Sequence, residues 1–198
     1  MLQQRIEQHF IDSADLKYQS AQALAKPVEQ AIQALLACVT GGGKVLACGH
    51  DGSAALAQHF AALFVGRFER ERPELGALAL TANGAILTAT ACGDDGGAFA
   101  RQVRALGQTG DVLVALSAQG QPASIQRAME AAQQRDMTVI ALTGQPDGDI
   151  GPALRETDVH IRVPHSRVAR IHEVHCLILH CLCDGVDTQL LGEQEYTE

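Results

Sequence analysis

The stretch KVLACGHDGSAALAQHF, residues 44–60, joins a short apolar run to a longer segment through a turn that contains two glycines. The apolar run at 44–49 is typical of a buried strand, and the spacing of apolar residues over 53–68 is typical of a helix. Ser53 offers a hydroxyl at the start of that helix, where backbone amides also point toward anions. The stretch therefore predicts a strand, a helix and a loop between them that could hold a phosphate.

The same alternation of short apolar runs and helical patterns continues along the chain, which favours an α/β fold. Parallel strands joined by helices form a sheet that is covered on both faces, so we expect three layers, α/β/α, in a single domain spanning 1–198 with its core at 44–188. Further strands are predicted at 76–80, 111–117, 138–144 and 159–163, and further helices at 99–106, 123–135 and 167–186.

Two helical segments precede the first strand, at 2–25 and 27–40, with Pro27 at the start of the second. We expect them to form a helical hairpin, which a doubly wound domain does not itself need. An added element of this kind commonly packs on a second subunit. The hairpin is therefore predicted to serve in oligomerisation.

Composition excludes several classes of protein. The chain has 198 residues, 46% of them hydrophobic, and 23 acidic against 15 basic residues give a formal charge of −8. The apolar content argues against disorder, and the acidic balance against direct binding of nucleic acid. There is no apolar signal segment and no run long enough to span a membrane, so we expect a cytoplasmic protein. Six cysteines without a CxxC pair are typical of buried thiols in a reducing compartment.

A second loop with possible chemistry is LSAQGQPAS, residues 116–124, which follows the third predicted strand. Ser117 supplies a hydroxyl, Gly120 allows a tight turn, and Pro122 suits the first turn of the next helix. In open α/β sheets, ligands bind beyond the carboxyl ends of the strands. Either loop could therefore hold a phosphate.

Four segments together resemble the sugar isomerase (SIS) domain family, and within it the phosphoheptose isomerases and their non-enzymatic, DiaA-like relatives. The resemblance implies a five-stranded parallel sheet, a homotetramer and pockets built from more than one subunit. The segments that carry it are AQHFAALFVGRFERERP (57–73), FARQVRALGQTGDVLVALS (99–117), RDMTVIALTG (135–144) and ARIHEVHCLILHCLCD (169–184).

The chain departs from the isomerase pattern at positions that carry chemistry. The isomerases read HFAAELVGRF, in which the glutamate acts as the base. Residues 59–68 of this chain read HFAALFVGRF, so Leu63 stands at the position of that glutamate. Leucine accepts no proton, and general-base catalysis contributes typically ~10²–10⁴-fold. The family loop STSGNS has become SAQGQP at 117–122, and CGNGGS has become CGHDGS at 48–53, which puts the carboxylate of Asp51 beside the expected phosphate.

Three histidines stand at positions that correspond to catalytic or metal-binding residues of the family. His180 stands at the position of the catalytic histidine, His59 matches a histidine that helps hold zinc in some members, and His172 replaces a glutamine ligand. The three could bind Zn²⁺ with an open fourth position. The alternative is a remnant cluster whose members are satisfied by hydrogen bonds, so no cofactor is required and zinc is an option.

These departures lead to a regulatory prediction. We expect a DiaA-like regulator of chromosomal replication initiation that binds the DnaA initiator protein and retains a degenerate sugar-phosphate pocket. Leu190 and Leu191, placed beyond the last predicted helix, are its candidate partner-binding residues. One alternative is a phosphoheptose isomerase that converts sedoheptulose 7-phosphate to D-glycero-D-manno-heptose 7-phosphate, with His180 as acid or base and Asp51 as a candidate for the missing base. The other is a non-catalytic sugar-phosphate sensor.

Overall fold

The computed structural model describes residues 1–91, 97–120 and 123–193, and that part of the chain contains a five-stranded parallel sheet. Its strand order is β2-β1-β3-β4-β5. Every strand coincides with a predicted run, which confirms the α/β prediction. The strands are β1 (Val45–Gly49), β2 (Ala77–Ala79), β3 (Val112–Ser117), β4 (Thr138–Thr143) and β5 (Val159–Arg162).

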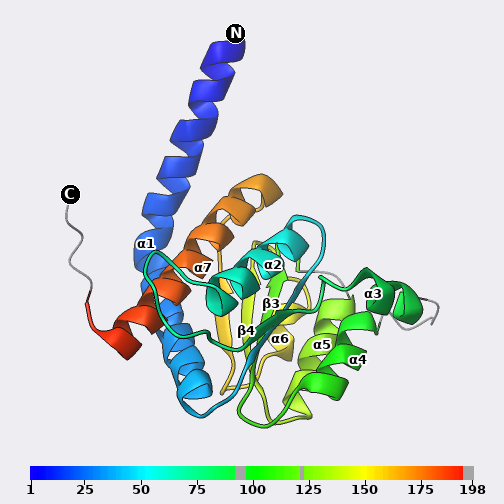
Figure 1. Cartoon of the computed structure of the whole chain (residues 1–198). Coiled ribbons are helices and arrows are strands. Elements are labelled where there is room, and N and C mark those ends of the chain that lie inside the picture. The colour runs from blue at the N-terminus through cyan, green and yellow to red at the C-terminus, as the bar shows by residue number, and fades with distance from the viewer. Residues whose placement is uncertain (92–96, 121–122, 194–198) are drawn as a thin grey trace.

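Helices cover both faces of this sheet (Figure 1). One face packs on α1 (Leu2–Thr40), α2 (Gly52–Val65) and α7 (Val168–Leu191), and the other on α4 (Ala98–Leu106) and α5 (Ala123–Gln133). Two short helices, α3 (Gly84–Ala91) and α6 (Ile150–Ala153), complete the second side. Neither was predicted, because each is too short to show a helical period in the sequence.

Alternate residues of each strand enter separate cores. Val45 and Ala47 of β1 belong to the core beneath α1, α2 and α7, whereas Leu46 and Cys48 belong to the core beneath α4 and α5. Successive side chains of a strand point to opposite faces of the sheet. The central strands read as continuous apolar runs for this reason, and burial on both faces fixes their place in the middle of the molecule.

The predicted N-terminal hairpin is wrong, because residues 2–40 form the single helix α1, with Pro27 inside it. Proline removes one backbone donor and disfavours a helix interior. Here the second half of α1 packs along α7 and buries residues that include Ala31, Leu35 and Cys38. Helical stability in proteins comes chiefly from such packing. The first turns of α1 extend away from the body of the molecule (Figure 1).

The strand order extends from β1 in both directions, with β2 on one side and β3, β4 and β5 on the other. β1 pairs with β2 on one side and with β3 on the other, so the helices that follow β1 and β3 leave to opposite faces. A crevice opens at such a switch point, beyond the carboxyl ends of the two strands. Gly49 and Leu116 are partners in the register and mark that edge.

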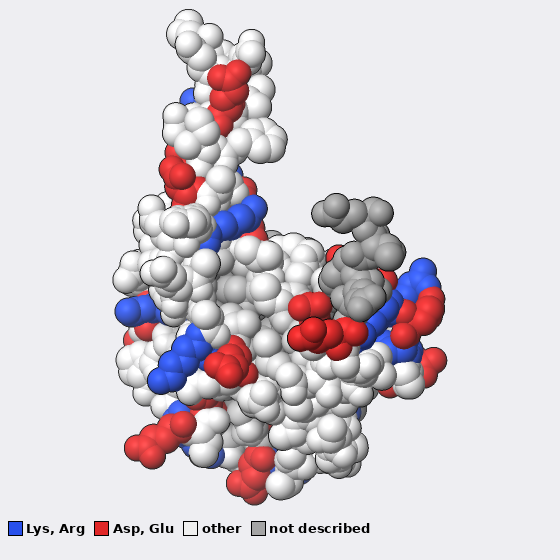
Figure 2. Space-filling model, turned by 90° about the vertical axis from the view of Figure 1, so that its left-hand side faces the viewer, with Lys and Arg blue, Asp and Glu red and all other residues white. Residues whose placement is uncertain are grey.

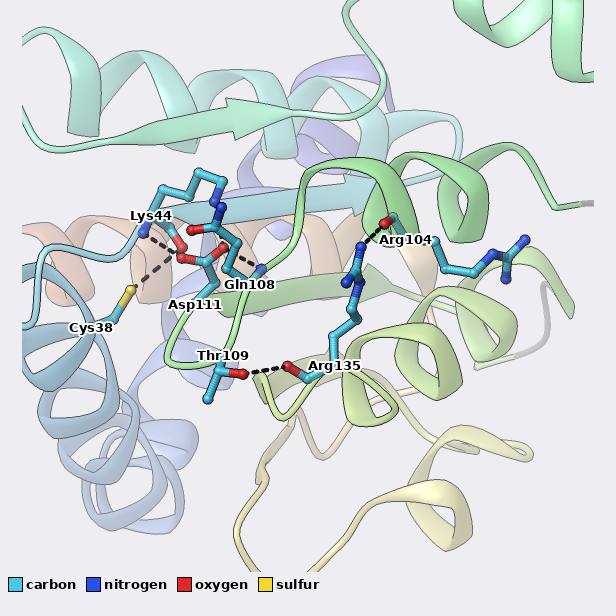
Figure 3. A network of polar contacts seen from close by, with 7 residues as sticks. All are labelled: Cys38, Lys44, Arg104, Gln108, Thr109, Asp111 and Arg135. Atoms are coloured by element: carbon cyan, nitrogen blue, oxygen red, sulfur yellow. Dashed lines mark hydrogen bonds and ion pairs between the residues drawn. The ribbon is translucent and has the colours of Figure 1, made fainter.

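At the amino ends of the strands, a buried carboxylate joins neighbouring segments of the chain (Figure 3). Asp111 Oδ1 accepts a hydrogen bond from the backbone N–H of Lys44 at 2.9 Å, and its Oδ2 accepts one from the backbone N–H of Gln108 at 2.8 Å and one from Lys44 Nζ at 2.6 Å. The carboxylate ties the start of β1 to the start of β3. This network is structural, because it lies at the amino ends of the strands, away from the crevice.

The last helix is longer than predicted and continues to Leu191. Leu190 packs against the core and extends the buried stripe of Leu182 and Val186, whereas Leu191 is 48% exposed. The placement of both leucines beyond the helix is therefore wrong. Among the described residues no helix has the length and apolar character that a membrane span requires. Acidic and basic side chains are interspersed over the face shown in Figure 2.

Candidate functional site

A small cavity of about 90 Å³ lies at the switch point between β1 and β3. The loop after β1 contributes Asp51 and Ser53, the loop after β3 contributes Ser117, and α7 contributes His172. The structure thus brings together three of the residues predicted for phosphosugar binding, with a histidine that was predicted for zinc. The fourth predicted residue, Gly120, lies in the same loop as Ser117.

His172 and Ser53 contact each other in the lining of this cavity. Ser53 Oγ lies 3.2 Å from His172 Nε2, and the imidazole lies so close to the turn that a Cβ at Gly52 would stand 2.5 Å from its Cε1. Burial lowers the pKa of His172, and the carboxylate of Asp51 opposes that shift. The imidazole is therefore neutral near neutral pH, and it can take up a proton when an anion arrives.

Asp51 occupies the N-cap position of α2 with φ of 50°, a backbone conformation that is uncommon for a residue with a Cβ. Its side chain makes no capping hydrogen bond, and the first turn of the helix is closed by backbone hydrogen bonds instead, with the N–H groups of Ser53 and Ala54 donating to the carbonyl of His50 at 2.9 and 3.2 Å. Backbone strain of this kind clusters at ligand-binding sites. The predicted proximity of Asp51 to the anion site is consistent with the placement of its loop.

The hydroxyl of Ser117 shapes the second loop. Ser117 is buried, and its Oγ accepts a hydrogen bond from the backbone N–H of Gly120 at 3.0 Å. Gly120 has φ of 68°, and a Cβ there would stand 2.2 Å from the carbonyl of Asp147. Glycine is therefore required at this position. Pro122 lies outside the described residues.

A larger cleft of about 500 Å³ adjoins the cavity and shares His50 and Asp51 with it. His50 Nε2 lies 2.5 Å from Ser124 Oγ, and its ring packs against Phe99 at 5.2 Å between centroids. Neither His50 nor Ser124 was predicted as a site residue from the sequence. Their positions directly after β1 and at the start of α5 were the only available signal.

A second cluster lies further along α2 and α7. His59 Nε2 stands 3.0 Å from His180 Nε2, so one ring donates a proton that the other accepts. Burial and the nearby His59 lower the pKa of His180. His172 is not part of this cluster, because it lies near the start of α7 beside Ser53. The predicted zinc set is therefore brought together only at His59 and His180.

Cys176 completes a different group of donors. Its Sγ lies 3.8 Å from His180 Nε2, and donor atoms of His59, Cys176 and His180 all fall within 4.8 Å of one another. Two imidazoles and a thiol are ligands that Zn²⁺ accepts, and three protein ligands leave a fourth position open. The residues present therefore fit a zinc ion, with the sulfur replacing the imidazole expected from the sequence.

Leu63 lies one turn beyond His59 on α2 and packs against the main core. Its side chain offers no proton acceptor, as the sequence indicated. Its backbone carbonyl accepts a hydrogen bond from Arg72 Nη2 at 2.7 Å. This position therefore contributes packing and a backbone hydrogen bond, and it supplies no base.

Comparison with known proteins places this geometry in a family. A model described as the SIS domain matches residues 9–144. The chain belongs to the SIS-domain family. It is 60% identical over 198 residues to the phosphoheptose isomerase of Methylibium petroleiphilum, a match that covers 100% of this chain and 99% of that one. It is 49% identical over 191 residues to the phosphoheptose isomerase of Dechloromonas aromatica, with 95% and 96% covered.

Solved SIS-domain structures agree with this assignment. The phosphoheptose isomerase GmhA from Neisseria gonorrhoeae superposes with a TM-score of 0.88 at 46% identity, over 95% of this chain and 100% of that one. A phosphoheptose isomerase from Francisella tularensis gives 0.91 at 39% identity, over 95% and 99%. The predicted five-stranded SIS fold is confirmed.

The same comparisons overturn the predicted function. Relatives that match over the full chain at 49–60% identity are named phosphoheptose isomerases, and the DiaA-like, DnaA-binding regulator was therefore the wrong choice. That prediction gave decisive weight to the glutamate replaced by Leu63. A proton acceptor can move within a site while the fold and the rest of the site persist, so one lost side chain does not establish the loss of an activity.

Proposed function

We propose that the chain is a phosphoheptose isomerase that interconverts sedoheptulose 7-phosphate and D-glycero-D-manno-heptose 7-phosphate. The observation that carries the proposal is the full-length likeness to proteins of that name, at 60% identity and with TM-scores of 0.88 and 0.91. The reaction needs a site for the phosphate and groups that move protons between two adjacent carbons and their oxygens. The chain offers a candidate for each.

The cavity between Asp51 and Ser117 is the candidate phosphate end. It lies at the amino end of α2, a helix of 14 residues whose dipole favours an anion at that end. Ser53 and His172 supply a hydroxyl and a neutral imidazole to it. Protonation of His172 when a phosphate binds would offset the charge of Asp51.

The His59–His180 pair is the candidate proton-transfer end. His59 is six residues beyond Ser53 on α2, which corresponds to about 9 Å along a helix. A heptose 7-phosphate carries its reacting carbons, C1 and C2, at the end of the sugar farthest from the phosphate. Proton-transfer groups are therefore needed at a distance from the phosphate, and this pair has that place. A neutral imidazole can remove the C1 proton of the ketose, and the resulting enediol is protonated at C2.

The test is turnover of sedoheptulose 7-phosphate by purified, chelator-treated protein in deuterium oxide. We expect the aldose product to appear by NMR with solvent-derived deuterium at C2, because the proton passes through an exchangeable imidazole. Absence of conversion both without and with added Zn²⁺ overturns the proposal. Sugar-phosphate binding without conversion would instead support the non-catalytic sensor.

Binding at the proposed phosphate site should change the number of protons bound to the protein. His172 is neutral in the free protein because burial lowers its pKa, and a bound phosphate dianion favours the charged imidazolium. Binding near neutral pH should therefore take up protons in the wild type and take up fewer in His172→Gln. Calorimetry in two buffers of different ionisation enthalpy measures the difference. Equal uptake in both proteins would place the phosphate elsewhere.

We also propose the homotetramer that the family resemblance implies. The projecting part of α1 leaves Leu2, Ile6 and Phe10 exposed by 74%, 49% and 74%, and their spacing of four residues puts them on one stripe. A helix without tertiary contacts is marginally stable in water. We therefore expect a second copy of the chain to pack against this stripe. In Figure 2 this segment is mostly uncharged.

Charge introduced on that stripe should break the assembly. Phe10→Glu is expected to lower the mass measured by light scattering, because a carboxylate would be buried between subunits. Gln4→Glu adds the same charge on the opposite side of the helix and should leave the mass unchanged. An identical mass for both variants would show that the stripe is not an interface.

A further inference from the structure

The cleft of about 500 Å³ beside the proposed phosphate cavity has no part in the reaction described above. Its volume is within the range of small-molecule sites, about 300–1,000 Å³. The cleft lies between the first turn of α2 and the helices α3, α4 and α5. The pair proposed for proton transfer, His59 and His180, lies further along α2 and does not line it. The cleft is therefore open to a different ligand.

The walls of the cleft are apolar or carry hydroxyl groups that are already paired. Thr81 Oγ1 donates to the carbonyl of Ala54 at 3.3 Å, and Thr90 Oγ1 donates to the carbonyl of Ile86 at 2.7 Å. A sugar would lose hydrogen bonds to water against such walls, and an unpaired buried hydroxyl is costly. The cleft therefore favours a flat, apolar body over a polyol. The apolar side chains that line it are Ala54, Leu87, Ala98 and Phe99.

Two rings lie together in the lining of this cleft. Phe99 is 4% exposed, and its ring packs against that of His50 with 5.2 Å between the centroids. His50 Nε2 also lies 2.5 Å from Ser124 Oγ, at the start of α5, so the orientation of the imidazole is fixed from two sides. Aromatic side chains held in this way offer a stacking partner to another flat ring.

The cleft and the phosphate cavity share His50 and Asp51. One molecule can therefore place a phosphate in the cavity and an aromatic ring in the cleft. We propose that the chain binds a nucleoside 5′-monophosphate, with its phosphate in the phosphate cavity and its base beside the His50–Phe99 pair. The assignment of the cavity to phosphate rests on the proposed function, whereas the preference of the cleft for a ring does not.

Calorimetric titration of the full, chelator-treated chain with adenosine 5′-monophosphate (AMP) tests the proposal without turnover. Ribose 5-phosphate is the matched control ligand, because it has the same sugar and phosphate and no base. AMP should bind at least about fivefold more tightly, which is the lower end of the gain from a stacked base. Equal affinities, or no binding of AMP, would overturn the proposal.

A substitution at Phe99 tests where the base lies. Phe99→Leu removes the ring and keeps an apolar side chain, so it should weaken AMP binding by about fivefold or more and leave ribose 5-phosphate unaffected. Phe64→Leu makes the same exchange in the core on the other face of the sheet and should change neither affinity. An unchanged affinity of Phe99→Leu for AMP would contradict the placement of the base.

Saturation-transfer NMR of the wild type gives a second readout that needs no variant. The base protons H2 and H8 of AMP should receive more saturation from the protein than the ribose protons, because the base is the part enclosed by the cleft. Stronger saturation of the ribose would show that the base lies outside the cleft, and it would overturn the proposal even if Phe99→Leu failed to fold.

Turnover tests whether the two ligands share the phosphate cavity. AMP should raise the KM for sedoheptulose 7-phosphate and leave kcat unchanged, because only one phosphate fits in the cavity. A lowered kcat with an unchanged KM would place AMP elsewhere and overturn the shared cavity. A chain that binds AMP and turns over no sugar phosphate would refute the isomerase alone, and turnover without AMP binding would refute the nucleotide site alone.

Discussion

Replacing His180 with alanine should lower the kcat of the metal-free protein by about 10²–10⁴-fold, the usual contribution of a positioned acid or base. The expectation follows from the pair that His180 forms with His59 at 3.0 Å and from the lowered pKa that keeps the ring able to accept a proton. The KM for the sugar phosphate should change much less, because the proposed phosphate site lies at the other end of α2. Steady-state rates with sedoheptulose 7-phosphate measure both constants.

The control for this variant is Cys181→Ala, at the neighbouring and exposed position of α7. It tests whether the helix tolerates a small side chain, and it should retain full activity. His59→Ala should fall between the two, because it removes the partner that orients His180 and leaves the imidazole itself. A His180→Ala protein within threefold of the wild type would show that another group moves the proton.

The sheet could be predicted from the sequence because each strand carries its own signal. The runs at 44–49, 111–117 and 138–144 are apolar at almost every position, which is typical of strands buried on both faces. Their parallel arrangement follows from the helices between them. The continuity of α1 through Pro27 could not be predicted, because it depends on packing against α7, more than a hundred residues away.

The candidate site shows the same limit. The two loops that we propose for phosphate binding each follow directly from a strand, and Asp51, Ser53 and Ser117 line one cavity, as their places after those strands predicted. The partners of the histidines depend on how α2 packs against α7, and no local pattern in the sequence encodes that register. His172 and His180 are eight residues apart on one helix, and they meet different partners, Ser53 and His59. Cys176 gave no signal in the sequence beyond its spacing of four from His180.

The register of α2 against α7 depends on a buried ion pair. Arg72 Nε lies 2.6 Å from Asp187 Oδ1, and the two side chains are 1% and 4% exposed. The guanidinium also donates to the carbonyls of Leu63 and Phe64 at the end of α2, at 2.7 and 2.8 Å. One side chain thus joins the last turn of α2 to α7, the two helices that carry His59 and His180.

Arg72→Met should therefore lower the free energy of unfolding by about 3–5 kcal/mol, because it leaves a buried carboxylate without its cation. Urea unfolding at fixed protein concentration measures the loss, since subunit association contributes to stability. Arg67→Met removes an arginine from an exposed pair with Glu71 and should cost no more than about 1 kcal/mol. The double variant Arg72→Met, Asp187→Leu should recover much of the loss, since no charge is then left unpaired.

The pH dependence of the Arg72→Met effect separates lost charge pairing from lost packing. Burial raises the pKa of Asp187, and Arg72 opposes that shift, so the pKa rises further once the arginine is gone. A carboxyl group whose pKa is raised in the folded state binds more protons folded than unfolded, and stability then increases as the pH falls. The deficit of Arg72→Met relative to the wild type should shrink toward acid pH. A deficit that stays constant would assign the loss to packing and to the unpaired carbonyls of α2.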